Sequence, residues 1–466
     1  MIAIAKEIFK AYDIRGVVDG TLTQDAVVNI ARAYATHANA KQVKQIVVGR
    51  DGRLSGAKLT HWLISTLNDC GIEVIDLGQI ATPMLYFAAL RWTDGSGIMV
   101  TGSHNPPEYN GFKMMLAQET LAGEAIQALL NTILSQNYSV EPFQARCYSQ
   151  DVSTLYQTTI VQDIKLKRAM TIVIDAGNGI AGKYAGALYR ALGCKVIELF
   201  CEVDGNFPNH HPDPANPENL KALQSELRNS GAELGLAFDG DGDRLGVVTR
   251  EGQIIYPDRL LMLFAQDVLA RNPQSKVIYD VKCSRLLAPW ILAHGGLPLI
   301  SQTGHSYIKA MLKKEEALLA GEMSGHIFFK ERWLGFDDGL YAGARLLEIL
   351  SRSSHASQVL DSLPNAISTP EICIAMNYEG QAHEIIHALQ TQAEQIKAEK
   401  VITIDGVRIE YSDGFGLVRA SNTTPKLILR FEADNSSALH RIRQVFYCML
   451  QPFLTSHTLK ELAGTQ

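Results

Sequence analysis

A strand–helix–strand pattern repeats three times along this chain and constrains its fold more than any other feature. Each copy starts with a short apolar, β-branched run, passes through a turn into roughly 12 to 15 residues of helical pattern, and reaches a second apolar run after a glycine. The first runs lie at 45–49, 171–175 and 276–280, and the second at 73–77, 195–199 and 297–300. Strands joined by a helix in this way pair in parallel. We therefore expect three similar α/β domains, each with a βαβ unit in a mixed sheet.

Each repeat then reaches a third apolar strand that opens into a polar loop. These strands lie at 98–100, 234–238 and 317–320, and their loops at 101–113, 239–244 and 321–326. Loops at the ends of buried strands are where binding and catalytic residues concentrate. Three similar domains would thus present three different polar loops from equivalent positions.

The remainder of the chain, after about Pro364, has a different pattern. We expect a helix near 381–397, strands around 406–411, 416–419 and 426–431, and a helix from Ser437. This order predicts an α+β domain with antiparallel strands, whose polar loop is 419–425. A chain of 466 residues exceeds what one hydrophobic core supports. We place four domains at 1–149, 150–253, 254–365 and 366–466.

The first polar loop centres on the hydroxyl of Ser103. Gly102 permits an unusual backbone angle beside it, and we expect the serine to be exposed at a strand end. Asn110 and Gly111 predict a second turn further on. Ser103 and His104 are neighbours on an extended segment, so their side chains should point in opposite directions. Another group must then activate the serine, and a tight turn without a catalytic role remains the alternative.

The second polar loop alternates three aspartates, Asp239, Asp241 and Asp243, with glycines. Such a loop can fold tightly enough for three carboxylates to converge on one hard cation, and without a cation they repel one another. An EF-hand is excluded because Arg244 and Arg250 occupy the positions that require Gly and Glu. A three-carboxylate site leaves coordination positions open for an outside oxygen, such as a phosphate on Ser103. A hairpin with solvated acids is the alternative.

The composition excludes several classes of protein. A net charge of -6 provides no field for nucleic acid or an anionic membrane. No stretch approaches the roughly 18 to 20 apolar residues of a membrane span, and residues 1–6 are too short for a secretory signal, so we expect a cytoplasmic protein. The seven cysteines are scattered without C-x-x-C spacing, which argues against a disulfide framework and a zinc knuckle.

Two further motifs allow other interpretations. The segment 177–182 fits G-x-G-x-x-G, with Glu198 on the next strand, but the other two repeats lack these glycines, so tight packing explains them and a dinucleotide site is the alternative. A P-loop is excluded because Tyr184 stands where Ser or Thr is required. The segment 209–213 contains two histidines and an aspartate, which is weak evidence for zinc.

Together these loops resemble the α-D-phosphohexomutase superfamily, and most closely its phosphomannomutase/phosphoglucomutase branch. The resemblance covers essentially the whole chain in order and includes segments 10–16, 49–53, 101–113, 173–179, 207–214, 239–244, 321–326 and 419–425. Met323, between Glu322 and Ser324, matches the hexose mutases, whereas glucosamine-phosphate mutases typically carry Gln there. The resemblance implies four domains around a central cleft.

The resemblance also implies an isomerase that interconverts 1- and 6-phosphates of mannose or glucose through phosphoserine at Ser103 and a hexose 1,6-bisphosphate, which acts as activator. One Mg²⁺ per chain would be held by Ser103, Asp239, Asp241 and Asp243. Catalytic candidates are Ser103, His104, Lys113, Arg244 and His326, with Lys113 and His326 as proton-transfer groups. Substrate-binding candidates are Tyr12, Arg15, Lys282, His305, Glu322, Ser324, Arg419, Ser421, Asn422, Thr423 and Thr424.

Within this set, Glu322 and Ser324 would read sugar hydroxyls, and the loop from Arg419 would clamp the non-reacting phosphate, because arginine offers a fork to phosphate. The clamp argues against a phosphoserine phosphatase, which need not retain a second phosphate. A glucosamine-phosphate mutase is a further alternative, whereas nothing supports a catalytically silent sugar-phosphate sensor, because the serine, the acids and the clamp are all present. The expected partners are small sugar phosphates, without nucleic acid or membrane, and the chain is expected to be a monomer or a dimer.

Overall fold

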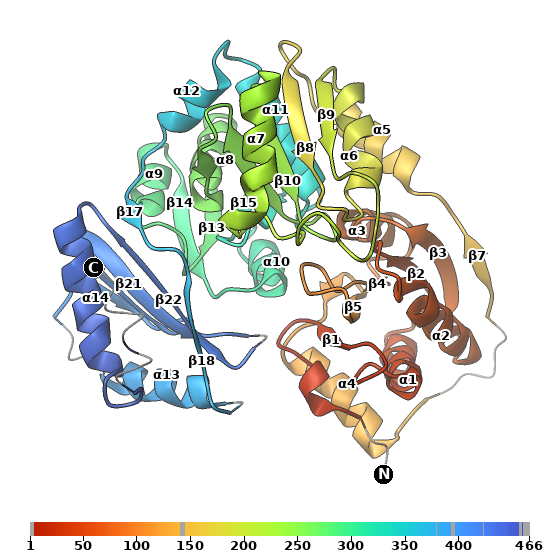
Figure 1. The fold of residues 1–466 in the computed structure, drawn as a ribbon. Helices are drawn as coiled ribbons and strands as arrows, with labels where there is room; N and C mark the ends of the chain where they lie inside the picture. Colours follow the sequence, from red (N-terminus) through yellow and green to blue (C-terminus); the bar gives the residue numbers. More distant parts are fainter. Residues whose placement is uncertain are drawn as a thin grey trace.

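The computed structural model describes residues 4–139, 145–378, 380–392, 397–422, 424–455 and 459. Its strands form four sheets, each built from one consecutive part of the chain. The four parts follow one another around an arc, with the N-terminal and C-terminal parts at its two ends (Figure 1). Three α/β domains and a C-terminal α+β domain are thus confirmed.

The first sheet has the order β1-β5-β4-β2-β3-β7, with β6 beside β5. Strands β3, β2 and β4 are parallel, and β5 is antiparallel to β4 and β1. Its strands are β1 (Ile14–Val17), β2 (Gln45–Arg50), β3 (Glu73–Gln79), β4 (Gly97–Val100), β5 (Tyr109–Leu116), β6 (Glu119–Thr120) and β7 (Cys147–Ser149). Its helices are η1 (Lys6–Ile8), α1 (Gln24–Ala40), α2 (Gly56–Asp69), α3 (Thr82–Trp92) and α4 (Glu124–Ser135).

The second sheet has the order β12-β11-β10-β8-β9, with β9, β8 and β10 parallel and β11 antiparallel to β10. Its strands are β8 (Thr171–Asp175), β9 (Lys195–Leu199), β10 (Leu234–Phe238), β11 (Leu245–Thr249) and β12 (Ile254–Ile255). Its helices are α5 (Ser153–Asp163), α6 (Gly182–Ala191), η2 (Pro217–Leu220) and α7 (Lys221–Ser230).

The third sheet has the order β14-β13-β15-β16, again with three parallel strands and an antiparallel one, β16. Its strands are β13 (Lys276–Asp280), β14 (Leu297–Ser301), β15 (Leu319–Gly321) and β16 (Ile327–Phe329). Its helices are α8 (Pro257–Arg271), α9 (Leu287–Ala293), α10 (His305–Lys314), α11 (Gly339–Leu350) and α12 (Ala356–Asp361).

The fourth sheet is antiparallel throughout, with the order β17-β22-β21-β20-β19 and β18 also beside β22. Its strands are β17 (Ile367–Ser368), β18 (Ile372–Ala375), β19 (Lys400–Ile402), β20 (Val407–Tyr411), β21 (Gly414–Ala420) and β22 (Lys426–Ala433). Helices α13 (Gln381–Gln392) and α14 (Ser436–Leu450) cover it. Residues 393–396 of the helix expected at 381–397 lie outside the described part of the chain.

The repeat positions the site. In each α/β domain the first strand of the repeat is central, the second and third flank it, and an antiparallel strand follows the third. The polar loops are the hairpins β4–β5, β10–β11 and β15–β16, so they leave equivalent edges of three sheets. Because a hairpin at the end of a buried strand has a rigid base, each loop can hold its side chains in place.

The prediction of a turn at Asn110 and Gly111 is wrong, because both residues lie inside β5. Gly111 pairs with Arg15 of β1, and a Cβ on Gly111 would lie 2.0 Å from the carbonyl oxygen of Ile14. The glycine therefore serves a close approach of two strands, which turn propensity does not distinguish from a turn.

One large hydrophobic core runs through the first three domains, and the first and the C-terminal domains each have a further core of their own. Helix α3 of the first domain is completely buried from Thr82 to Ala89. The Phe87 ring lies 5.5 Å from that of Tyr156 and 5.7 Å from that of Trp333. Helix α3 thus joins the first three domains through apolar contacts.

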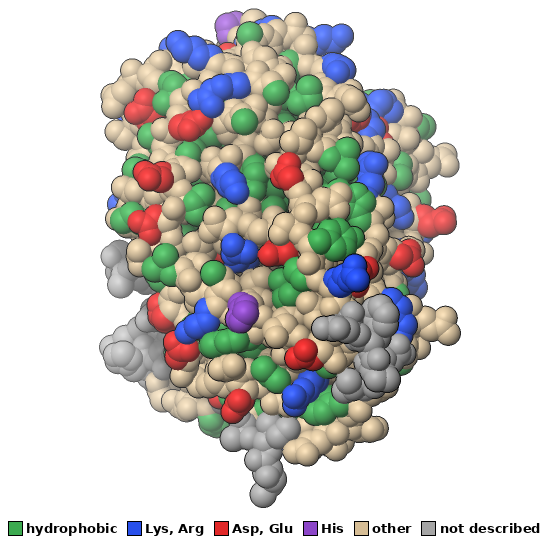
Figure 2. All heavy atoms as spheres, turned by 90° about the vertical axis from the view of Figure 1, so that its right-hand side faces the viewer, with side chains coloured by type: hydrophobic (Ala, Val, Ile, Leu, Met, Phe, Trp, Pro, Cys, Tyr) green, Lys and Arg blue, Asp and Glu red, His purple; other side chains and the backbone are tan. Residues whose placement is uncertain are grey.

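The described surface and cysteines agree with the composition. The face in Figure 2 mixes basic and acidic side chains and shows no patch of one sign. All seven cysteines are described, and none forms a disulfide. Among the described residues, no helix has the length and apolar character needed to cross a bilayer.

Candidate active site

Loops from all four domains meet at a cleft of about 560 Å³. Most predicted site residues line it: Tyr12, Arg15, Ser103, His104, Lys113, Arg244, Lys282, His305, Glu322, Ser324, His326, Arg419, Ser421 and Asn422. The three aspartates of the β10–β11 loop lie just behind this lining and are fully buried. Thr424 is exposed and its hydroxyl lies 3.0 Å from that of Ser421, and Thr423 lies outside the described residues.

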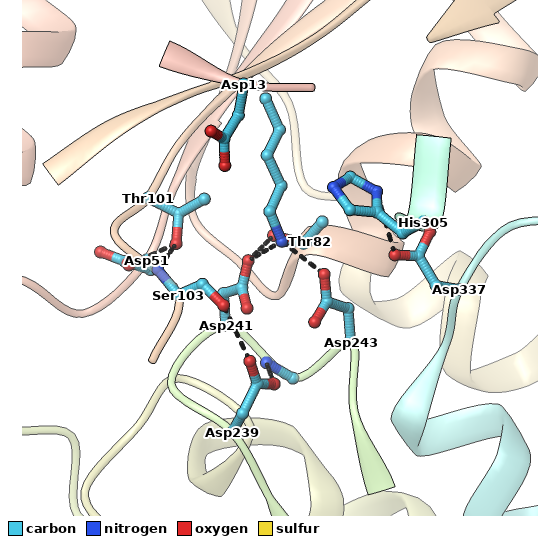
Figure 3. Close-up of polar contacts among 12 residues, drawn as sticks. Asp13, Asp51, Thr82, Thr101, Ser103, Asp239, Asp241, Asp243, His305 and Asp337 are labelled. Carbon is cyan, nitrogen blue, oxygen red and sulfur yellow. Dashed lines mark hydrogen bonds and ion pairs between the residues drawn. The ribbon is translucent and has the colours of Figure 1, made fainter. Parts of the chain in front are cut away.

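Ser103 is buried, with 1% of its surface exposed, so the prediction of an exposed serine is wrong. Its φ of 49° lies in the left-handed region, which residues other than glycine rarely adopt. The hydroxyl donates to Asp239 Oδ2 at 3.0 Å (Figure 3). It also lies 3.2 Å from His104 Nδ1, so the prediction that the neighbouring side chains diverge is wrong too. The segment is not extended, and the two side chains converge.

The glycine before the serine has a different role from the one expected. The unusual backbone angle belongs to Ser103 itself, while Gly102 has no positive φ. A Cβ on Gly102 would lie 2.5 Å from the guanidinium carbon of Arg53 and 2.8 Å from the carbonyl oxygen of Tyr109. Gly102 is therefore needed for close packing.

The three aspartates of the second loop lie close together, and two of them contact the ammonium group of Lys113. One carboxylate oxygen from each of Asp239, Asp241 and Asp243 lies within 4.8 Å of the others. Lys113 Nζ donates to Asp241 Oδ2 at 2.7 Å and also to Asp243 (Figure 3). Burial and the two neighbouring carboxylates raise the pKa of Asp239 well above its usual range, whereas Lys113 more than offsets burial and lowers the pKa of Asp241.

This group fits a hard divalent cation. The Oδ1 atoms of Asp241 and Asp243 are buried and have no hydrogen-bond partner. A buried carboxylate oxygen without a partner is costly, and carboxylate oxygens are the ligands that Mg²⁺ prefers. One ammonium cannot neutralise three carboxylates.

The rings of His305 and His326 stack in the cleft with their centroids 5.4 Å apart. Behind them lies Asp337, which the sequence analysis did not select. Its Oδ2 is 3.1 Å from His326 Nδ1 and 3.5 Å from His305 Nδ1, and its Oδ1 accepts from Lys309 at 3.0 Å. Burial alone would raise the pKa of Asp337, but Lys309 and the two imidazoles hold it well below its usual range. Asp337 is thus an ionised group shared by two histidines.

Arg244 fixes the proton arrangement of His326. Its Nε donates to His326 Nε2 at 3.1 Å, so Nε2 is the acceptor and the ring proton of the neutral imidazole is on Nδ1, facing Asp337. Arg244 also lies 3.8 Å from Asp239, next to Ser103. This guanidinium therefore connects the second loop to the third.

The sugar-reading candidates lie on the third loop. Gly304 N–H donates to Glu322 Oε1 at 2.7 Å, while Glu322 Oε2 is buried without a partner. Burial, more than neighbouring charges, raises the pKa of Glu322 to about 6. Lys282 Nζ donates to Glu371 Oε1 at 2.8 Å, and Glu371, which the sequence analysis missed, also lines the cleft. Glu322 Oε2 is the acceptor here that a ligand could satisfy.

The clamp loop closes the cleft from the C-terminal domain. Arg419 Nε donates to Asp405 Oδ2 at 2.9 Å, and its Nη2 is buried without a hydrogen-bond partner. Asn422 Nδ2 donates to the carbonyl oxygen of Thr303 at 3.0 Å, which joins this loop to the third domain. Arg419 thus offers an unused N–H donor in the cleft, as an anion site requires.

The two weaker motifs have structural roles. His210 Nε2 contacts Asp175 at 3.0 Å, and His211 contacts the carbonyl oxygen of His104, so the two histidines do not share a ligand position. A Cβ on Gly177 would lie 3.0 Å from His210, and one on Gly182 only 2.3 Å from the carbonyl oxygen of Cys201. Tight packing therefore accounts for both glycines.

Three further missed residues lie close to the Ser103 loop and the aspartates, and a sequence signal marks two of them. Asp51 and Arg53 lie beneath the Ser103 loop and directly follow β2. Thr82, at the start of α3, donates to Asp241 Oδ2 at 2.6 Å. Polar residues beyond the carboxyl ends of parallel strands are candidates for a site. That rule would have selected Asp51 and Arg53, whereas Thr82 carries no such signal.

Comparisons with known proteins follow the same division of the chain. Four family models match: phosphoglucomutase/phosphomannomutase alpha/beta/alpha domains I, II and III at residues 6–140, 148–252 and 256–367, and the C-terminal domain at 377–447. The chain is 59% identical to a phosphoglucomutase of Neisseria gonorrhoeae, over 97% of this chain and 98% of that one.

Two further proteins are similar over nearly the whole chain. A phosphomannomutase/phosphoglucomutase of Pseudomonas aeruginosa is 55% identical over 94% of both chains. The crystal structure of a phosphoglucomutase/phosphomannomutase family protein from Burkholderia thailandensis superposes with a TM-score of 0.91 at 51% identity, over 96% of this chain and 98% of that one.

Proposed function

The chain belongs to the phosphoglucomutase/phosphomannomutase family, and on that premise we propose that it interconverts the 1- and 6-phosphates of glucose and mannose. The observation that carries the proposal is the meeting, in one cleft, of a serine hydroxyl bonded to Asp239 with an arginine that has an unused donor for a second phosphate. A phosphatase would need the serine but no clamp such as Arg419. An isomerase that retains its intermediate needs both.

We propose that Ser103 carries a phosphoryl group in the active enzyme. The bond from phosphorus to Ser103 Oγ breaks as a bond forms to the free hydroxyl oxygen of a bound hexose monophosphate, which gives a 1,6-bisphosphate. The proton of that hydroxyl passes to His326, because Lys113, our second candidate for proton transfer, already donates to Asp241 and Asp243 and is held as an ammonium. The bisphosphate turns over in the cleft and returns its other phosphoryl group to Ser103. Arg244 and His104 lie beside Ser103, where charge moves during transfer.

We propose that Asp239, Asp241 and Asp243, with an oxygen of the Ser103 phosphate, hold one Mg²⁺ per chain. When bound, the cation would withdraw charge from the transferring phosphoryl group. The unpartnered oxygens of Asp241 and Asp243 support this assignment. Lys113 stays bonded to the same carboxylates and adds a second positive charge.

The sugar and its fixed phosphate would be held by the third and fourth loops. We propose that Glu322 and Ser324 bind two ring hydroxyls while the clamp binds the non-reacting phosphate. Glucose and mannose differ only at C2, so a site that reads two other hydroxyls accepts both. The assigned phosphate ligands are Arg419, Ser421, Asn422, Thr423 and Thr424, and the assigned flanking residues are Tyr12, Arg15, Lys282 and His305.

Turnover and phosphate content test the proposal together. Purified protein would be incubated with glucose 1-phosphate or mannose 1-phosphate and a trace of glucose 1,6-bisphosphate, with intact mass measured before and after a phosphatase. We expect both 6-phosphates, loss of activity with a chelator, and one removable phosphate. Glucosamine 1-phosphate is the comparison substrate, and its exclusive use would contradict the proposal.

Ser103→Ala is the decisive variant. It should lower kcat by at least about 1,000-fold, because the covalent route is lost, and should carry no removable phosphate. Its free energy of unfolding should change by only about 1 to 2 kcal/mol, since one hydrogen bond to Asp239 is lost. Wild-type turnover of a folded Ser103→Ala protein would contradict the phosphoserine mechanism.

We further propose the domain limits 1–149, 150–253, 254–365 and 366–466, activation by hexose 1,6-bisphosphate, and action as a monomer in the cytoplasm. The substrates support the location, because charged sugar phosphates do not cross membranes unaided. Neither nucleic acid nor a membrane is part of the proposed reaction. Limited proteolysis and light scattering would check the limits and the oligomeric state.

A further inference from the structure

We propose that Arg53 is a positioning residue that fixes the backbone of Ser103, acting with Asp51 and Thr101 through a closed ring of hydrogen bonds and an ion pair. The inference rests on the proposed function, in which Ser103 carries the transferred phosphoryl group. Arg53 touches neither substrate nor phosphate in this arrangement. It acts through the conformation of the serine.

Arg53 is buried, and the terminal nitrogens of its guanidinium donate hydrogen bonds to the Ser103 loop. Nη2 and Nη1 donate to four carbonyl oxygens: Ser103 at 2.8 Å, Asn105 at 2.5 Å, Pro106 at 2.6 Å and Tyr109 at 2.8 Å. The fifth N–H, on Nε, lies 3.3 Å from Asp51 Oδ2. The four terminal N–H groups are thus all used on backbone carbonyls, Nε faces Asp51 at ion-pair distance without a hydrogen bond, and Arg53 does not line the cleft, so it offers no terminal donor to a ligand. This count separates Arg53 from the catalytic cations.

The ring passes through both backbone groups of Ser103. Ser103 N–H donates to Thr101 Oγ1 at 2.8 Å, and Thr101 Oγ1 donates to Asp51 Oδ2 at 2.7 Å (Figure 3). The same Asp51 oxygen faces Arg53, whose Nη2 returns to the carbonyl oxygen of Ser103. The N–H and C=O of one residue are thus held by a single aspartate–arginine pair.

The conformation being held explains why such a ring is needed. A serine with a φ of 49° is in a strained region, and such a residue persists only when its surroundings over-determine it. Arg53 itself is confined from two sides. On one side Gly102 packs so closely against the Arg53 guanidinium that a Cβ at residue 102 would not fit. On the other side the guanidinium carbon lies 5.2 Å from the centroid of the ring of Phe207, from the second domain. The angle that aims Ser103 Oγ at Asp239 therefore depends on Arg53.

The test variant is Arg53→Lys, which keeps the charge but loses the fork that reaches four carbonyls. We expect kcat to fall about 100-fold, as a misplacement of about 1 Å can cause. The KM for glucose 1-phosphate should stay within about twofold, because Arg419 is untouched. The ³¹P resonance of the phosphoserine should shift or broaden, since its backbone is no longer fixed.

The matched control is Arg259→Lys. Arg259 is also buried, and its guanidinium donates to three carbonyl oxygens, those of Leu360, Leu363 and Pro364, but it does not line the cleft. This variant should lose stability while keeping kcat per folded chain and the ³¹P resonance. If removing any buried guanidinium has the same effect, kcat per folded chain should fall equally in Arg53→Lys and Arg259→Lys. That result would overturn the inference.

A second variant covers the case in which Arg53→Lys does not fold. Thr101→Val is nearly isosteric and opens the ring at another bond, so kcat should fall about tenfold with KM unchanged. Wild-type kcat and an unmoved ³¹P resonance in folded Arg53→Lys, or in Thr101→Val, would refute the positioning role and leave the mutase mechanism intact. A wild-type protein without a phosphoserine resonance would instead refute the proposed function itself.

Discussion

Two residues of this site each have one polar atom that the rest of the described chain leaves without a hydrogen-bond partner. Glu322 has one oxygen bonded to Gly304 and one buried without a partner, and Arg419 has one nitrogen bonded to Asp405 and one without a partner. A buried polar atom without a partner destabilises the protein, so a ligand that hydrogen-bonds to either atom removes that cost. Both unused atoms belong to residues that line the cleft.

The first prediction concerns pH and Glu322, whose pKa burial raises to about 6. A carboxyl group is ionised above its pKa and protonated below it, so acceptor capacity at Oε2 is lost as the pH falls through this pKa. The KM for glucose 1-phosphate should therefore rise below about pH 6. Glu322→Gln should raise KM at all pH values and remove this dependence, and a wild-type KM that is flat from about pH 5 to 8 would contradict the role.

The second prediction concerns Asp337, which faces both imidazoles. Asp337→Asn keeps the size of the side chain but removes the charge that orients His305 and His326. We expect kcat to fall about 10- to 100-fold, within the range for a disturbed proton-transfer group. The Ser103 phosphate content should remain that of the wild type. Loss of the phosphate in this variant would instead assign Asp337 to the metal and serine side of the cleft.

At the scale of elements, the buried strands were predictable and the contacts between segments were not. Strands β2, β8 and β13 are apolar runs because helices cover both faces, and such runs can be recognised in sequence. Strand β5 was missed because Asn110 and Gly111 have turn propensity, although the glycine serves a close approach to β1. Propensity is local, whereas that approach depends on a strand distant in the sequence.

For the site as well, local patterns could be predicted from the sequence and contacts between distant segments could not. The serine, the three aspartates and the clamp were predicted because each is a dense local pattern, and the serine and the clamp line one cleft with the aspartates buried behind it. Asp337 was missed because no dense polar pattern marks its segment, in which the next residue, Asp338, caps helix α11. The φ of Ser103 could not be predicted, because Arg53 and Thr101 impose it from elsewhere in the fold. The domain limits stay a prediction.

The third prediction is about that cap. Asp338 accepts from the hydroxyl of Tyr156 at 2.8 Å, from Trp333 Nε1 at 3.0 Å and from the backbone N–H of Tyr341 at 2.9 Å. Asp338→Ala leaves three buried donors without an acceptor and should lower the free energy of unfolding by about 3 to 5 kcal/mol. Asp338→Asn, which retains an acceptor oxygen, should cost clearly less. Urea unfolding measures both, and equal losses would show that the cavity and not the donors dominates.

At the scale of the whole molecule, three domains share one core and the fourth is joined mainly by polar contacts. The apolar contact between them is small and centres on Val281, Phe415 and Leu417. Around it, Arg408 donates to the carbonyl oxygens of Val281 and Cys283, both at 2.6 Å. Small, polar interfaces between domains permit relative motion. The clamp loop is therefore carried by the least firmly attached domain.

The fourth prediction follows from this division. Calorimetry should resolve two unfolding transitions, with the C-terminal domain first and the other three domains together. Glucose 1,6-bisphosphate contacts both units in the proposed complex, so it should raise the lower Tm and bring the transitions closer. A single transition without ligand would show that the polar interface is stronger than its composition indicates.

Helix α3 has a consequence for how the chain is made. Its apolar faces are buried against Tyr156 and Trp333, and a ribosome completes Trp333 roughly 250 residues after α3, about 10 to 50 s later at ~5–20 residues per second. During that interval the first domain would have its own sheet and α5 would supply Tyr156, but the part of α3 that packs on Trp333 would stay uncovered. Synthesis from the N-terminus thus leaves apolar surface of α3 exposed until the segment that contains Trp333 has been made. We expect the nascent chain to depend on a chaperone until that segment has emerged.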